Sequence, residues 1–177
     1  FRLAARLSPE ISLEAKTFGY VKVQLDGSYY QPLGDRVVIA GRARLGGIAG
    51  ASQSTIAPSR LFYAGGGGSI RGFGYQLIGP LNALNQPTGG RSLAEFSLEA
   101  RVRLPVFGGN FGVVPFIDAG NVYEKSLPDF KGMRVGVGVG LRYYSNFGPI
   151  RIDVGMPLAR RPKESRVSIQ VSLGQAF

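Results

Sequence analysis

Hydrophobic and polar residues alternate along most of this 177-residue chain. The last segment shows the pattern most clearly, with apolar residues recurring on one parity: Val167, Ile169, Val171, Leu173 and Phe177. A period of two is the spacing of side chains on one face of a β-strand. We therefore predict eight strands and no helix, at residues 1–7, 20–29, 36–45, 95–104, 111–123, 134–143, 150–156 and 166–177.

The segments that connect the predicted strands differ in length. Short turns rich in Gly, Pro, Asn or Asp are expected at 31–35, 107–110 and 145–148, whereas 125–131 and 157–165 are longer. The segment from about residue 49 to residue 92 is far longer than an ordinary loop. Short turns on one side and long loops on the other are typical of outer-membrane β-barrels.

A soluble β-sandwich would show the same alternation, so the kinds of residue decide between the two folds. The polar faces carry Arg, Gly, Ser and a few carboxylates, rather than the Lys, Glu and Thr of a solvated sheet. Aromatic residues gather near the expected strand ends, as they do at membrane interfaces: Tyr20, Tyr29, Tyr30, Phe107, Phe111, Tyr123, Tyr143, Tyr144 and Phe147. We predict an all-β fold, a transmembrane antiparallel β-barrel, as one domain over residues 1–177.

Composition narrows the range of functions. No run approaches the roughly 18 to 20 apolar residues of a transmembrane helix. Cys and His are absent, which removes thiolate chemistry and the commonest general base and metal ligand. The formal net charge of +10 is spread over the strands rather than clustered, which argues against nucleic acid binding. We expect no cofactor and no metal.

An enzyme built on barrel loops would need acids beside a nucleophile. Asp153, Glu124 and Asp129 are available, but no G-x-S-x-G segment accompanies them. The simpler interpretation is that Glu124 and Asp129 are solvated loop residues, while Asp153 pairs inside the barrel with Arg151 or Arg142. We therefore predict that the chain is not an enzyme.

The long loop contains the most unusual segment of the chain. Four glycines, which we interpret as a hinge, precede Ile70, Arg71, Gly72 and Phe73: Gly65, Gly66, Gly67 and Gly68. The segment after the hinge is too apolar for a loop left in water. Glycines let the chain reverse and approach other backbone closely. We expect this loop to fold back into the barrel with Arg71 buried.

A buried guanidinium needs a carboxylate. The acids predicted to face inward are few: Asp26, Glu95, Glu99, Asp118 and Asp153. Asp118 lies between Phe116 and Gly120, and Glu99 lies on the neighbouring strand, so we expect these two acids to meet Arg71. The next strand has glycine at three successive inward positions, Gly136, Gly138 and Gly140. This glycine stripe has no side chains, so the docked loop could approach the strand there.

These residues resemble the signature of a known family. Residues 70–73 are similar to the [V/I]RG[F/Y] motif of the BamA/TamA superfamily of outer-membrane assembly and secretion proteins, and 116–120 resemble its FxDxG motif. Residues 97–99 match the strand that supplies a second acid. The wider patterns at 62–66, 69–73, 78–80 and 148–153 look most like the TamA branch. The last strand resembles the family's terminal β-signal, through Val171, Leu173, Gly174 and Phe177. A terminal aromatic residue can equally anchor a strand at the membrane interface.

The resemblance implies a bacterial outer-membrane barrel of sixteen strands, preceded by POTRA domains. It makes the loop at about 49–92 the sixth extracellular loop, which enters the lumen so that its arginine engages the acids. A closed eight-stranded barrel has room only for its own side chains. We therefore expect the C-terminal half of a wider barrel, or two self-associating copies, and a start at Phe1 that is processed or truncated.

The resemblance also implies a function and partners. The expected function is to assist insertion and folding of other outer-membrane proteins or autotransporters, with an exposed terminal strand pairing with the substrate. Expected partners are outer-membrane lipid, the unfolded substrates, and an inner-membrane or periplasmic protein. The alternative is a polypeptide-translocating pore of the two-partner secretion type, for which a lumen rich in arginine is suited: Arg2, Arg42, Arg44, Arg101, Arg103 and Arg142.

Overall fold

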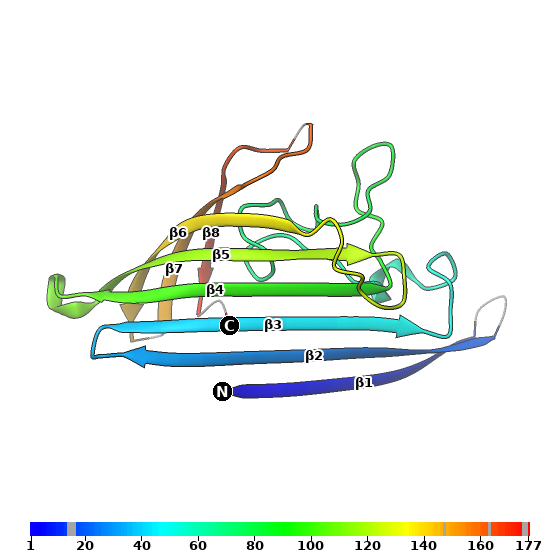
Figure 1. Ribbon diagram of the computed structural model, residues 1–177, viewed down its shortest axis with the longest axis horizontal. Helices are drawn as coiled ribbons and strands as arrows, with labels where there is room; N and C mark the ends of the chain where they lie inside the picture. The colour runs from blue at the N-terminus through cyan, green and yellow to red at the C-terminus, as the bar shows by residue number, and fades with distance from the viewer. Residues whose placement is uncertain (14–16, 147, 163, 175–176) are drawn as a thin grey trace.

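The computed structural model describes residues 1–13, 17–146, 148–162, 164–174 and 177. Its strands form one antiparallel sheet in which each strand pairs with the next along the chain (Figure 1). The eight strands are β1 (Arg2–Ser12), β2 (Phe18–Leu33), β3 (Val37–Ala49), β4 (Ser92–Leu104), β5 (Phe111–Tyr123), β6 (Arg134–Ser145), β7 (Gly148–Pro157) and β8 (Ser168–Leu173). The predicted all-β antiparallel fold is confirmed.

Helical structure is limited to two single turns of 3₁₀-helix in the described ranges, η1 (Pro58–Arg60) and η2 (Phe107–Gly109). Within the same ranges, no helix has the length and apolar character needed to cross a membrane. Of the predicted aromatic set, Phe147 and the side chain of Phe107 lie outside what the structure describes.

The last strand is shorter than its alternating sequence predicts. We expected a strand over 166–177, but β8 begins at Ser168 and ends at Leu173. Gly174 has a φ of 89°, a conformation that turns the chain away from strand geometry. The first strands are longer than expected, because β1 continues to Ser12 and β2 continues to Leu33.

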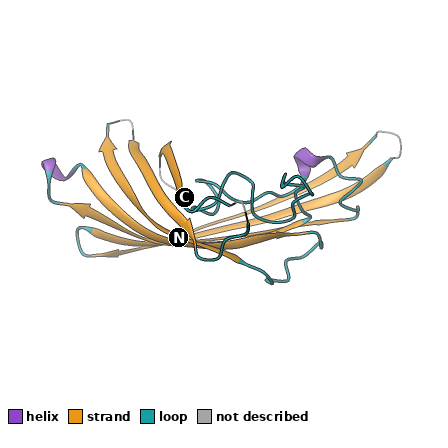
Figure 2. Cartoon of the chain, turned by 90° about the horizontal axis from the view of Figure 1, so that it is seen from above, coloured by secondary structure: helices purple, strands orange, loops and turns teal. Residues whose placement is uncertain are grey.

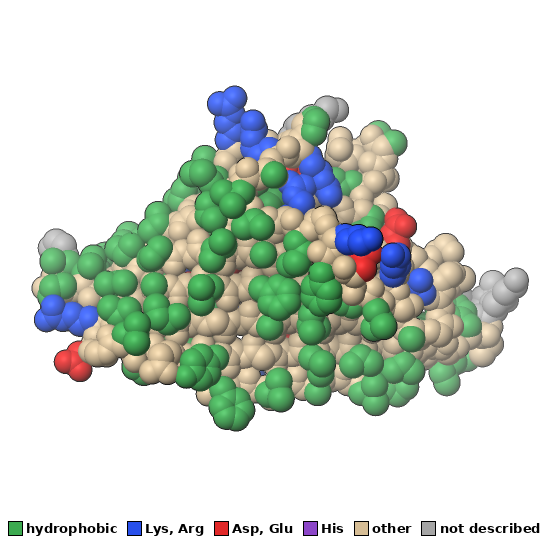
Figure 3. Space-filling model, viewed as in Figure 1, with side chains coloured by type: hydrophobic (Ala, Val, Ile, Leu, Met, Phe, Trp, Pro, Cys, Tyr) green, Lys and Arg blue, Asp and Glu red, His purple; other side chains and the backbone are tan. Residues whose placement is uncertain are grey.

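The curved sheet has a convex and a concave face of opposite character (Figure 2). Alternate residues such as Leu25, Leu98 and Ile169 point from the convex face and stay exposed. Hydrophobic side chains cover this face, and charged side chains gather toward its ends and margins (Figure 3). Because soluble proteins bury such residues, this arrangement suits a wall that faces lipid.

The long loop, residues 50–91, folds over the concave face and builds an apolar core there (Figure 2). Its buried members come from the loop and from the strands below it: Tyr20, Ile48, Ile56, Leu61, Phe62, Ala64, Ile70, Phe73, Ile78, Leu93 and Val122. Two strand glycines make room for this packing. A Cβ added at Gly46 or Gly120 would lie 2.5 Å from the Phe62 ring or the Ile70 side chain, respectively.

Candidate functional site

The segment that carries Arg71 is shaped by its own backbone. Gly65 and Gly66 have φ values of 109° and 102°, which favour glycine, and a β-bridge joins Ala64 to Ile78. Gly72 has a φ of 91°, and a Cβ there would lie 3.0 Å from the backbone of Met156 on β7. A side chain larger than hydrogen at position 72 would therefore push the loop away from the sheet.

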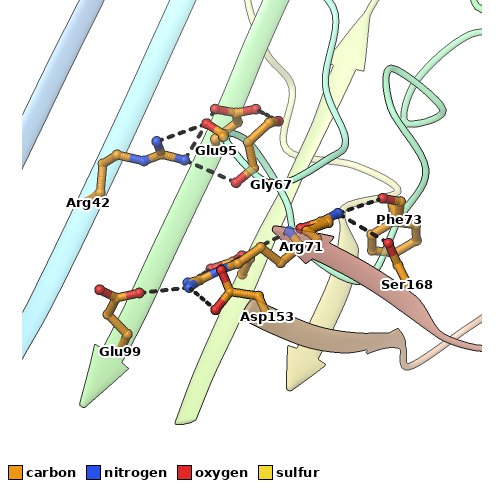
Figure 4. A network of polar contacts seen from close by, with 12 residues as sticks. Arg42, Gly67, Arg71, Phe73, Glu95, Glu99, Asp153 and Ser168 are labelled. Carbon is orange, nitrogen blue, oxygen red and sulfur yellow. Dashed lines mark hydrogen bonds and ion pairs between the residues drawn. The ribbon is translucent and has the colours of Figure 1, made fainter. Parts of the chain in front are cut away.

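Arg71 sits at the centre of a buried ion-pair cluster (Figure 4). Its Nε and Nη2 donate to the two carboxylate oxygens of Asp118, at 2.7 and 2.9 Å. Its backbone N–H donates to Asp118 at 2.9 Å, and Nη1 donates to Glu99 at 2.8 Å. The structure thus brings together Arg71 and the two acids that the sequence singled out.

The environment of Arg71 stabilises its charge. Burial by itself disfavours a charged guanidinium, but hydrogen bonds and charges from Asp118 and Glu99 outweigh it, so the pKa of Arg71 is raised above its ordinary value. The guanidinium carbon also lies 3.7 Å from the centre of the Phe116 ring, a cation–π distance. Arg71 therefore stays charged, and the carboxylates on β4 and β5 hold it.

A second ion-pair cluster lies beside the first, on β6 and β7. Asp153 pairs with Arg142 at 2.8 Å and with Arg151 at 3.2 Å, so both predicted partners are present. Its carboxylate is also 4.0 Å from Nη1 of Arg71. Asp153 is therefore buried among three cations. This arrangement supports the interpretation of Asp153 as an ion-pair residue rather than a catalytic acid.

The glycine run contributes hydrogen-bond acceptors as well as a turn. Arg151 donates to the carbonyl oxygen of Gly67 at 2.5 Å, and Arg42 donates to the carbonyl oxygens of Gly68 and Ser69 at 3.2 and 3.0 Å. The Ser69 hydroxyl donates to Glu95. Arginines from β3 and β7 thus hydrogen-bond to the loop backbone from both sides.

Sequence reasoning missed these backbone contacts. It placed Arg42 in the lumen and Glu95 among the inward acids, but it assigned neither to the loop. The pairs Arg42–Glu95 and Arg44–Glu95 lie at 3.8 and 3.2 Å, so Glu95 bridges two strand arginines as it meets Ser69. The parity of the strands signals that these residues face inward, but no local pattern links a side chain to a distant carbonyl.

The glycine stripe on β6 is only partly a seat for the loop. A Cβ at Gly136 would clash with the carbonyl oxygen of Arg71. At Gly138 the nearby side chain is the Phe116 ring, and at Gly140 the neighbours are side chains of the Asp153 cluster. The expectation that the loop occupies all three positions was wrong, because backbone and side-chain atoms of the strands fill the last two.

A glycine that the sequence did not single out also contacts the loop. A Cβ at Gly155 on β7 would lie 2.8 Å from the backbone nitrogen of Gly72. Gly155 lies opposite Gly138 in the β6–β7 register, so close approach extends across two strands. A strand glycine can mark a close approach of other backbone, and the pairing of Gly155 with Gly138 is the sequence signal that could have revealed this contact.

The terminal strand splits the predicted signal residues between the two faces. Val171 and Leu173 point outward from β8 and are exposed. Phe177 was expected on the same face, and this was wrong: its ring centre lies 5.3 Å from the guanidinium carbons of Arg42 and Arg101 on the concave side. The turn at Gly174 redirects the chain, and the cations attract the aromatic ring.

Comparisons with known proteins agree with this architecture. Residues 2–177 match the model of the Omp85 superfamily domain. The chain is 30% identical over 166 residues to the outer membrane protein assembly factor BamA of Nitratidesulfovibrio vulgaris, a match that covers 89% of this chain and 20% of that protein.

Solved structures show the same fold. BamA from Haemophilus ducreyi, lacking POTRA domains 1–3, superposes with a TM-score of 0.68 at 20% identity, over 97% of this chain and 37% of that one. CdiB from Acinetobacter baumannii superposes with a TM-score of 0.61 at 18% identity, over 97% and 30%. The chain thus spans about a fifth of its curated relative and about a third of these structures. Because the family match covers almost every residue, this chain belongs to the Omp85 superfamily, whose members are β-barrels of the bacterial outer membrane.

Proposed function

We propose that this chain assists the insertion and folding of other outer-membrane proteins, autotransporters among them. The carrying observation is the terminal strand. β8 has six residues and pairs along one edge with β7, and its other edge has no strand partner among the described residues. An open edge presents backbone donors and acceptors that can pair with an incoming strand. Binding of this kind needs no covalent chemistry.

The proposed role of the loop is to hold the wall beside this edge. We call the set Ile70, Arg71, Gly72, Phe73, Glu99, Phe116, Asp118 and Gly120 the loop lock, with residues 65–68 as its hinge. Buried charge-assisted pairs link the loop to β4 and β5, and its backbone approaches β6 and β7. A loop bound to these strands would keep their curvature while the edge strand exchanges partners.

The proposed domain is one half of a wider barrel. The strands of this chain form a sheet whose outer edges, on β1 and β8, are not paired with each other in the described residues. The BamA and CdiB structures extend well beyond the part that this chain matches. Residues 1–177 would then be the C-terminal strands of a sixteen-stranded barrel with the lumen-entering loop at about 49–92. Self-association of two copies is the competing closure, and the oligomeric state of the full-length protein in detergent distinguishes them.

Within the family, we propose the TamA branch, with autotransporters as substrates and an inner-membrane or periplasmic protein as partner. Its support is the set of sequence patterns around the loop and at 148–153. The full-length protein can be purified from whole cell envelopes and from isolated outer membranes. A protein that co-purifies only from the whole envelopes would be such a partner.

The chain contains no cysteine, so a single introduced thiol tests the edge directly. With Val171→Cys in the full-length protein, we expect crosslinks to an unfolded barrel substrate that carries one cysteine. Ile152→Cys, on the interior strand β7, is the matched control and should crosslink weakly. Acceleration of substrate folding in vesicles without any preference for position 171 would contradict the edge mechanism.

A polypeptide-translocating pore is the second candidate, because CdiB shares the fold and the concave face is rich in arginine. The two functions predict different ion currents across a bilayer. A pore should conduct in planar bilayers and be blocked by an unfolded substrate, whereas an assembly factor should accelerate barrel folding without such a block. Of the six lumen arginines, Arg42, Arg44, Arg101 and Arg142 already pair with acids. This leaves Arg2 and Arg103 as the arginines of the set for which no acid lies within 4 Å among the described residues.

A further inference from the structure

The connection between β5 and β6, residues 124–133, lies outside the sheet instead of over its concave face. In Figure 1 it passes across the end of β4 on the viewer's side. Gly47 points outward from β3, and a Cβ there would lie 2.7 Å from the carbonyl oxygen of Ser126. The rings of Phe130 in the connection and Phe96 on β4 have centres 6.4 Å apart. This loop therefore packs on the convex, lipid-facing side.

An apolar groove of about 520 Å³ runs between this loop and the neighbouring strands. We call it the outer groove, and its apolar side-chain walls are Val21, Val23, Leu25, Leu45, Ala49, Leu127 and Pro128. No charged residue lines it in the described structure. Leu127 is a loop residue and is 75% exposed. A large apolar side chain is unfavourable in water, so its exposure favours contact with another apolar surface. The groove continues the apolar convex face without interruption.

The depth of the outer groove in the membrane follows from β2. Tyr29 points outward near the short-turn end of this strand and is 55% exposed, as expected for an interfacial aromatic residue. A membrane-spanning strand needs about 9 to 11 residues. Counting back from Tyr29 places Val21 to Leu25 in the leaflet nearer the long loops, which are extracellular in outer-membrane barrels.

A polar pocket adjoins the outer groove on the side away from the membrane centre. It is lined by residues 50–53, which follow Ala49 of the groove, by Glu124 and Lys125, which precede Ser126 of the groove, and by Arg91. Arg91 donates to the carbonyl oxygens of Glu124 at 2.8 Å and Ala51 at 2.9 Å, which fixes the two walls of this pocket to each other. The site is thus apolar toward the membrane centre and charged toward the long-loop end.

We propose that the outer groove binds one acyl chain of an outer-leaflet lipid, with the lipid headgroup beside Arg91 and Lys125. The occupant is a lipid because the walls belong to the lipid-facing surface and lie at acyl-chain depth. A bound lipid would hold residues 124–133 against β3 and β4. This inference rests on the family's membrane location and is independent of the proposed assembly function.

The test uses the full-length protein in phosphatidylethanolamine and phosphatidylglycerol vesicles that contain a trace of phospholipid with a photoactivatable acyl chain. We expect labelling at 21–25, 45–49 and 126–128 to exceed several-fold that at Ile152 and Val154, which are similarly outward on β7. Leu127→Asn, which makes one wall polar, and Ala49→Phe, which fills the groove, should each remove this excess.

Leu84→Asn is the matched control, because Leu84 is a loop leucine with 77% exposure that does not line the groove. It should leave the labelling pattern unchanged. Uniform labelling of the convex face would overturn the proposal, as would an excess that survives both groove variants. Absence of label at the groove, with a co-purified protein or second copy crosslinked there instead, would also overturn it. None of these outcomes depends on assembly activity.

Discussion

The long loop is held very differently by the centre of the sheet and by its edge strand. At the centre, Arg71 makes buried, charge-assisted hydrogen bonds, a bidentate pair to Asp118 and a single bond to Glu99. At the edge, Gln170 of β8 donates to the carbonyl oxygen of Phe73 at 3.3 Å. Charge-assisted bidentate pairs are roughly twice as strong as neutral hydrogen bonds. The difference indicates a loop that stays with β4 and β5 while β8 can move.

The largest effect is expected from Arg71→Ala. Removing the cation leaves Asp118 buried without its main partner, a change that costs about 3–5 kcal/mol in buried ion pairs. The loop should then open far more often, and its cleavage by protease should accelerate by about a hundredfold or more. The measurement is limited proteolysis of the full-length protein in detergent or vesicles.

Two variants sharpen this result. Arg71→Lys keeps the charge but cannot reproduce the bidentate geometry, so it should fall between Arg71→Ala and the parent. Arg103→Ala removes an arginine that stacks on Tyr144, with 4.5 Å between guanidinium carbon and ring centre, and should leave the loop protected. Equal protection in Arg71→Ala and the parent would show that the ion pairs do not hold the loop.

The next largest effect is expected from Glu99→Gln. Glu99 accepts from Arg71 at 2.8 Å and from Arg101 at 2.7 Å, so one substitution weakens two charge-assisted bonds without changing shape. Hydrogen bonds to charged groups contribute about 1.5–3 kcal/mol. Loop cleavage should accelerate less than in Arg71→Ala, because Asp118 remains. A larger effect than that of Arg71→Ala would contradict the assignment of Asp118 as the main partner.

A steric test of the same contact is Gly136→Ala. The added methyl group would meet the carbonyl oxygen of Arg71, and overpacking of this kind costs about 1–3 kcal/mol. The control is Gly68→Ala, since among the described residues no atom beyond its chain neighbours lies within 4 Å of a Cβ at that position. Hydrogen exchange of residues 69–73 should rise in the first variant only. If both behave alike, the loop is not seated on β6.

The smallest effect on the loop is expected from Gln170→Leu. It removes two neutral hydrogen bonds, one to the carbonyl oxygen of Phe73 and one to the hydroxyl of Ser168 within β8. Only the first holds the loop, and such a bond is worth about 0.5–1.5 kcal/mol, so proteolysis of the loop should hardly change. Hydrogen exchange of β8 should increase, because the side chain that joins it to the loop is lost. Ser172→Ala, on the same face, is the control. A loop that opens as readily as in Arg71→Ala would erase the distinction between centre and edge.

The sequence alone predicted much of this architecture. Alternation with a period of two reveals strands because neighbouring side chains must face opposite ways, and it also places Asp118, Glu99 and Asp153 inside. The glycine run and the apolar residues after it predicted a docked loop around Arg71. These features are visible because each depends on neighbours within a few residues.

Only the tertiary structure decided which backbone atoms the strand arginines contact and where Phe177 lies. Arg42 and Arg151 grip the carbonyl oxygens of Gly68 and Gly67, contacts made by backbone atoms that carry no residue identity. The same holds for Phe177, whose ring lies near Arg42 on the concave face, against the parity predicted for a strand over 166–177. Periodicity determines which face a side chain occupies, whereas curvature and register determine what it finds there.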